Sequence, residues 1–168
     1  MPDCAPGICI NNDYIDKSKW PSKEKRHWRV ESDYPSQADK DDQLDKIKKK
    51  ADGQRVNTYV ANHWTFEYDL AYSGLGNEII EAIVKVKYAP KNQLDKTKEM
   101  KNSWSEYKDD EEKASYIYSY FWGDSTSKAE VAQQLALLLE EKFINDVEEF
   151  KTKLPSYLVN AINYVVNR

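Results

Sequence analysis

The stretch Asn57-Thr-Tyr-Val-Ala-Asn-His-Trp-Thr-Phe-Glu-Tyr-Asp-Leu-Ala-Tyr-Ser73 decides which fold the sequence predicts. The run Val56 to Ala61, which overlaps its start, is rich in residues that favour β-strands and predicts a strand at 55–62. Thr65 then occupies an N-cap position, and Glu67 and Asp69 follow in the first turn of a helix, where acidic side chains suit the helix dipole. A strand that leads directly into a helix places the turn at the carboxyl edge of a sheet, where open α/β folds hold their sites. The alternative is that Thr65 only caps the helix and Glu67 only faces water.

Helix signals outside this stretch predict most of the remaining elements. Residues 39–52 have the composition of a charged helix, and Gly74-Leu-Gly76 should break the central helix before a second one begins near Asn77. Residues 91–113 fit an exposed helix or an insertion, and residues 114–122 fit a helix or a strand. Ser127 and Glu130 form a capping box for a further helix, and Pro155 is a favoured first residue of the last one. A short apolar run, 7–10, predicts another strand.

Three segments, in chain order, resemble motifs in the TOPRIM nuclease part of OLD-family ATP-dependent endonucleases. Val60 to Ala71 resembles N-x-x-[ST]-[LF]-E-x-[DE]-L. Ser127 to Ala136 is similar to the family's K-G-x-x-A-x-x-L-A helix, and Leu154 to Val165 is similar to its closing [IL]-P-x-Y-[IL]-x-x-A-I-x-Y-[IV]. The resemblance covers roughly residues 7–166 and is weakest at 14–54 and 90–115.

This resemblance implies an α/β fold: part of a TOPRIM-like, Rossmann-like parallel sheet with helices, followed by a helical C-terminal segment. We expect a single domain over residues 1–168, with the strand and helix part at 1–73 and the mainly helical part at 74–168. The implied function is divalent-metal-dependent DNA cleavage, which would need an ATPase subunit or a missing N-terminal part of the protein. The five glycines of the chain do not form a Walker A loop, so we expect no nucleotide site in it.

The resemblance also implies a metal site for Mg²⁺ or Mn²⁺. The acidic D-x-D pair of the family falls on Asn11 and Asp13, its [ST]-x-E falls on Thr65 and Glu67, and its lysine falls on Lys128. Asp13 and Glu67 would ligate the cation, with Asn11 at the position of the first acid, and Thr65 would add a hydroxyl or orient a ligand. Lys128 would offset charge on the phosphate in the transition state. Lysine in a first helical turn opposes the dipole, which independently points to a function for Lys128.

Two departures from the family pattern favour a different class of function. The first acid of the D-x-D pair is Asn11, and an amide binds Mg²⁺ more weakly than a carboxylate. The chain also starts too late to contain the family's upstream glutamate segment. The alternative is therefore a catalytically inactive binding module that acts through protein or DNA contacts in phage–host conflict. Joint retention of Thr65, Glu67 and Lys128 favours the enzyme.

A basic stretch at 17–29 is the best candidate for contact with DNA. It interleaves lysines and arginines with two tryptophans, which suits phosphate contact together with base stacking. A charged loop that only faces water is the alternative. We select Lys25, Arg26 and Arg29 for the DNA backbone and Trp28 for stacking on a single strand.

Composition and charge exclude several further classes of protein. The 25 basic and 29 acidic residues give a net charge of −4, which excludes a uniformly basic DNA-binding surface but not a local patch. The mean hydropathy is −0.87, and no apolar run approaches the ~20 residues of a membrane span. The N-terminal residues do not resemble a signal peptide, and two cysteines make no disulfide framework. We expect a cytoplasmic protein, and the sequence leaves its oligomeric state open.

Overall fold

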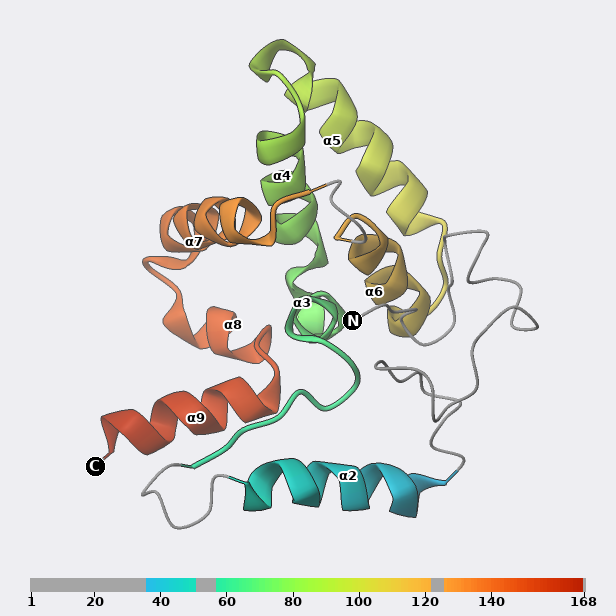
Figure 1. Cartoon of the computed structure of the whole chain (residues 1–168). Coiled ribbons are helices and arrows are strands. Elements are labelled where there is room, and N and C mark those ends of the chain that lie inside the picture. The colour runs from blue at the N-terminus through green and yellow to red at the C-terminus, as the bar shows by residue number, and fades with distance from the viewer. Residues whose placement is uncertain (1–35, 51–56, 122–125, 168) are drawn as a thin grey trace, which may run out of the picture.

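The described part of the chain, residues 36–50, 57–121 and 126–167 of a computed structural model, consists of helices and connecting loops without a strand (Figure 1). The predicted α/β fold with a TOPRIM-like parallel sheet is therefore wrong for these residues. In chain order the elements are α2 (Gln37–Lys49), α3 (Phe66–Leu70), η3 (Ala71–Leu75), α4 (Gly76–Lys87), α5 (Pro90–Ser105), α6 (Asp110–Ser119), α7 (Lys128–Phe143), α8 (Val147–Thr152) and α9 (Ser156–Val166).

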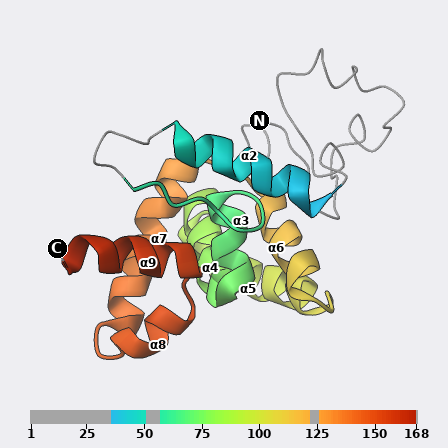
Figure 2. The same ribbon diagram turned by 90° about the horizontal axis from the view of Figure 1, so that it is seen from below.

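The strand predicted at 55–62 is absent from the part of it that the structure describes, residues 57–62. These residues run without regular structure between α2 and α9, as Figures 1 and 2 both show. No backbone hydrogen bond joins residues 57–61 to another described residue. A β-forming sequence becomes a strand only when a second strand pairs with it. The other predicted strand, 7–10, lies outside the described residues.

Helix starts agree well with the local signals. Thr65 is the N-cap of α3, where its hydroxyl accepts a hydrogen bond from the backbone N–H of Tyr68 at 3.4 Å. Ser127 caps α7 in the same way through the N–H of Glu130 at 3.3 Å. The ambiguous run at 114–122 is helical in α6 as far as Ser119. Pro155, the predicted first residue of the last helix, is instead its N-cap, and α9 begins one position later, at Ser156.

Helix α4 is the centre of the hydrophobic core. Figure 1 shows α7 on one side of α4 and α5 on the other, with α6 alongside. The side chains of Ile79, Ile80 and Ile83 are fully buried among these helices. Full burial of such a side chain contributes about 1.5–3 kcal/mol to folding, so this face of α4 holds the bundle together. None of the described helices has the length and apolar character needed to cross a membrane.

Two glycines shape the connection from α3 to α4. Gly74 has φ of 120°, a conformation that L side chains rarely adopt, and it interrupts the helical path between α3 and α4. Gly76 starts α4 at a close approach, because a Cβ atom at this position would lie 2.6 Å from Trp104 Cζ2. The predicted break at 74–76 is therefore confirmed. Because of this break, α3 does not continue along the axis of α4, and the first turn of α3 lies next to the start of α7.

Candidate functional site

Glu67 and Lys128 form an ion pair between two helix starts. The Oε1 atom of Glu67, in the first turn of α3, lies 3.1 Å from Nζ of Lys128, the first residue of α7. The Lys128 side chain is half exposed and the Glu67 side chain is 21% exposed. Lys128 Nζ also lies 5.9 Å from the centre of the Tyr118 ring. The structure thus brings together two residues that the sequence selected from separate motifs.

Thr65 lies two residues before Glu67, at the start of the same helix. Its hydroxyl is used as the N-cap of α3, which satisfies one of the backbone N–H groups that lack an intrahelical acceptor. This is the alternative role that the sequence offered for Thr65. The capping bond leaves the position of Glu67 well defined, because Glu67 belongs to the turn that the cap closes.

Asp69 is the residue whose role the sequence did not predict. Its side chain is 1% exposed and its carboxylate accepts backbone hydrogen bonds from Asn62 at 2.7 Å, Trp64 at 3.0 Å and His63 at 3.3 Å. Hydrogen bonds to a charged acceptor are among the strong ones. Asp69 therefore fixes the loop that leads into α3. The only sequence feature that pointed to this role of Asp69 was the position of an acidic residue in the first turn of a helix that follows a polar loop.

Two buried hydroxyl groups, of Thr126 and Tyr157, have no hydrogen-bond partner among the described residues. Thr126 immediately precedes the cap of α7, and Tyr157 lies in the first turn of α9. Burial, together with the negative charges of Asp69 and Glu67, raises the pKa of Tyr157 to about 12. The side chain of Asn62 adds a direct link to α9 by donating to Ser156 Oγ at 3.3 Å.

The described residues do not by themselves fit a divalent metal. No group of three or more His, Cys, Asp or Glu side chains within the described ranges is arranged to hold an ion. Glu67 supplies one carboxylate, whereas Mg²⁺ favours six oxygen ligands. Of the other predicted metal-site residues, Thr65 caps α3, and Asn11 and Asp13 lie outside the described residues, so the metal site stays a prediction. The same holds for the predicted DNA contacts of Lys25, Arg26, Trp28 and Arg29.

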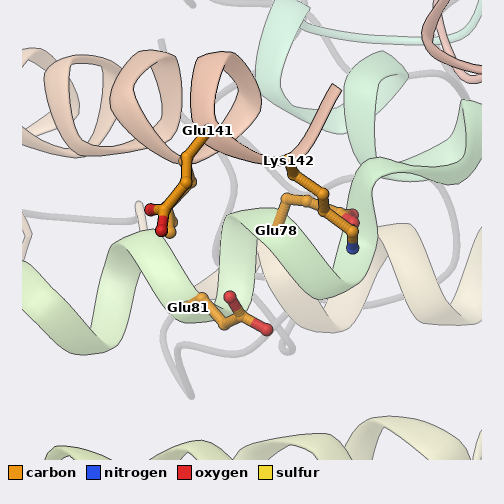
Figure 3. A pocket seen from close by; sticks show the side chains of 5 residues that line it. Glu78, Glu81, Glu141 and Lys142 are labelled. Atoms are coloured by element: carbon orange, nitrogen blue, oxygen red, sulfur yellow. The ribbon is translucent and has the colours of Figure 1, made fainter. Parts of the chain in front are cut away.

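A second polar cluster lines a shallow pocket between α4 and α7. The pocket has a volume of about 310 Å³. Figure 3 shows Glu78 of α4 meeting Lys142 of α7, with Glu141 pointing from α7 towards α4 and the Glu81 carboxylate directed away from α7. Lys142 donates a hydrogen bond to the buried carboxylate of Glu78, which raises the pKa of Lys142. Glu81 pairs with Lys101 of α5 at 2.5 Å. Lysines thus neutralise two of the three acids, which fits a structural link between helices.

Comparison with known proteins adds no relative to this picture: no protein-family model, curated protein or solved structure matches the chain. The resemblance to OLD-family endonucleases therefore rests on the three sequence motifs alone.

Proposed function

We propose that the chain is part of a divalent-metal-dependent DNA endonuclease, in which Glu67 and Lys128 belong to the reacting centre. The observation that carries the proposal is the 3.1 Å ion pair between them. The motifs selected an acid and a lysine from distant segments, and the helices that bear them meet in space. An acid beside a lysine at the surface suits phosphodiester hydrolysis, in which negative charge develops on a phosphate.

Lys128 is the group that would contact the phosphate. It is half exposed, it carries positive charge, and it begins α7, where a cation opposes the helix dipole by a few tenths of a kcal/mol. When no ligand is bound, the negative charge of Glu67 offsets the unfavourable interaction of Lys128 with the α7 dipole. An exposed ion pair contributes only about 0–1 kcal/mol, so an incoming phosphate can displace the carboxylate from Lys128.

Glu67 would then be one of several ligands for Mg²⁺ or Mn²⁺. Asp13 and Asn11 complete the set in this proposal, and an ATPase subunit or a missing N-terminal part contributes the remainder of the enzyme. A cation bound there would supply positive charge near the phosphate. The proposed setting is a reducing cytoplasm, because the two cysteines form no disulfide framework.

Calorimetric titration with Mn²⁺ and nicking of supercoiled plasmid test this proposal. Glu67→Gln should abolish Mn²⁺ binding. Lys128→Met should keep it and should lower any nicking at least tenfold. Glu148→Gln is the matched control, because Glu148 forms an exposed ion pair with Lys151 at 2.6 Å away from the site. Unchanged Mn²⁺ binding by the Glu67 variant, or equal losses in the control, would refute the assignment.

A catalytically inactive binding module is the second candidate. It is favoured by Asn11 at the position of the first family acid and by the single carboxylate that the described site provides. A module of this kind would hold DNA equally well in the presence of Mn²⁺ and of EDTA, as measured by fluorescence anisotropy. The nuclease should instead bind more tightly with Mn²⁺, and Glu67→Gln should remove that difference.

A further inference from the structure

We propose that the turn between α4 and α5 binds the phosphates of duplex DNA through three lysines, Lys85, Lys87 and Lys91. The inference rests on the proposed function, since it gives the DNA of that site a second contact surface on the same chain. This surface lies within the described residues, and none of the sequence motifs selected its lysines.

The α4–α5 turn is a basic segment in an acidic protein. Residues 82–94, all of which the structure describes, contain three lysines and no aspartate or glutamate, whereas the whole chain has a net charge of −4. All three lysines are exposed. None of them forms an ion pair with a described acidic residue, although seven other described lysines do. The positive charge of the turn is therefore free to meet an external anion.

Stabilisation of helix ends accounts for at most two of the three lysines. Lys85 and Lys87 lie in the last turn of α4, where cations suit the helix dipole. The side-chain amide of Gln93 already donates there, to the carbonyl oxygens of Tyr88 at 3.0 Å and of Lys85 at 3.4 Å. Lys91 lies in the first turn of α5, where a cation opposes the dipole, and that turn contains no acid. An anionic partner would offset this unfavourable placement.

The end of α6 connects the turn to the proposed reacting centre. Nζ of Lys87 lies 5.4 Å from the centre of the ring of Tyr120, the C-cap of α6. Nζ of Lys128 lies 5.9 Å from the ring of Tyr118, two residues earlier. Figure 1 shows the turn at the end of α4 that is remote from α3. The 12 residues of α4 span about 18 Å, the length of about five base pairs, so one duplex can reach both places.

The composition of the turn favours DNA over an anionic membrane as its partner. Leu94, at 68% exposed, is the one large hydrophobic side chain within residues 82–94 that is exposed. A segment that binds at a membrane surface buries a whole apolar face among the lipids. Lysines without such a face neutralise phosphates in any base sequence. We therefore expect the turn to hold the DNA backbone without reading its sequence.

Fluorescence anisotropy with a labelled duplex oligonucleotide in EDTA, over a range of salt concentrations, tests this surface. The test variant replaces the three lysines of the turn by glutamine. The slope of log affinity against log salt should flatten by roughly two to three units, because each phosphate contact contributes about 0.9. Lys91→Gln alone should flatten it by about one unit. Circular dichroism melting checks that each variant is folded.

A matched control removes the same charge from the end of α2. It replaces three exposed lysines there by glutamine, namely Lys48, Lys49 and Lys50. The control should change the slope by less than about one unit. Equal flattening in the two triple variants would overturn the inference, because net charge alone would then explain the effect.

Mn²⁺ calorimetry separates this inference from the proposed function. The turn variant should bind Mn²⁺ as the wild type does. An unchanged salt slope in the turn variant, together with loss of Mn²⁺ binding in Glu67→Gln, would overturn the DNA contact and leave the nuclease proposal standing. A flattened slope, with Mn²⁺ binding intact in Glu67→Gln, would do the opposite. Binding to phosphatidylserine vesicles that requires the three lysines, without binding to DNA, would overturn the inference in favour of a membrane surface.

Discussion

The carboxylate of Asp69 accepts a hydrogen bond from the backbone N–H of Asn62 at 2.7 Å, and this contact ties the start of α3 to the loop before it. The N–H groups of His63 and Trp64 point to the same carboxylate. These three donors have no strand to pair with in the described structure, so the acid of the following helix satisfies them. The loop, the cap at Thr65 and the position of Glu67 therefore depend on one buried charge.

Replacing Asp69 by alanine should destabilise the fold by about 2–4 kcal/mol, because three partly buried backbone donors lose their shared charged acceptor. Urea unfolding followed by circular dichroism measures the loss. Asp109→Ala is the control: Asp109 caps α6 through one exposed hydrogen bond to the N–H of Glu112, and its loss should cost about 1 kcal/mol. Equal losses in the two variants would show that Asp69 acts as an ordinary cap.

Gly76→Ala should destabilise the chain by about 1–3 kcal/mol, because its Cβ would overlap the Trp104 ring at 2.6 Å. Trp104→Phe removes the overlapping ring atoms, so the double variant should recover at least ~0.5 kcal/mol relative to the sum of the single changes. Gly74→Ala provides the contrast. A Cβ atom there would make only ordinary van der Waals contact, with Lys153 Cγ nearest at 3.7 Å, but its φ of 120° is strained for alanine. Trp104→Phe should therefore give no recovery with Gly74→Ala.

The helix starts were predictable because their determinants are local. Thr65 and Ser127 each act on a backbone group three residues ahead, and Gly74 interrupts a helix through its own backbone. Such signals lie within a few positions of sequence and do not depend on the rest of the fold.

Whether residues 55–62 form a strand could not be decided from composition in the same way. Tyr59 and Val60 favour extended backbone, but a strand also requires a paired neighbour, and no described segment supplies one. The three bonds to Asp69 were equally hidden, because they follow from the path of the loop rather than from residue spacing. The meeting of Glu67 with Lys128 was implied only by the family resemblance, since periodicity within α3 or α7 does not relate the two helices.

The basic stretch at 17–29, which lies outside the described residues, can be tested without a structure. Replacing Lys25, Arg26 and Arg29 together by alanine should flatten the slope of log affinity for duplex DNA against log salt by roughly two to three units, if each contacts one phosphate. Fluorescence anisotropy over a range of salt concentrations measures this slope. The melting temperature should stay nearly constant, because exposed charges contribute little to stability. An unchanged slope would favour a stretch that only faces water.

Tyr157 should make the fold sensitive to alkaline pH. Burial first, and then the charges of Asp69 and Glu67, raise the pKa of its hydroxyl to about 12 in the folded chain, whereas an unfolded tyrosine has a pKa of about 10. Between these two values the unfolded chain releases the proton and the folded chain keeps it. The contribution of Tyr157 is therefore fully present below pH 10 and is lost as the pH rises towards 12.

Tyr157→Phe removes this pH dependence. Near pH 8 the variant should be about as stable as the wild type, because no described residue hydrogen-bonds to the hydroxyl that it deletes. Near pH 11.5 it should be more stable by on the order of 1–3 kcal/mol, since a shift of about two pKa units corresponds to that range. Urea unfolding at both pH values gives the double difference, and Tyr107→Phe, which lies away from the Glu67–Lys128 pair, corrects for general effects of alkali. A double difference equal to that of Tyr107→Phe would mean that the Tyr157 hydroxyl meets water or a ligand in solution, and that its environment is more polar than the folded chain alone provides.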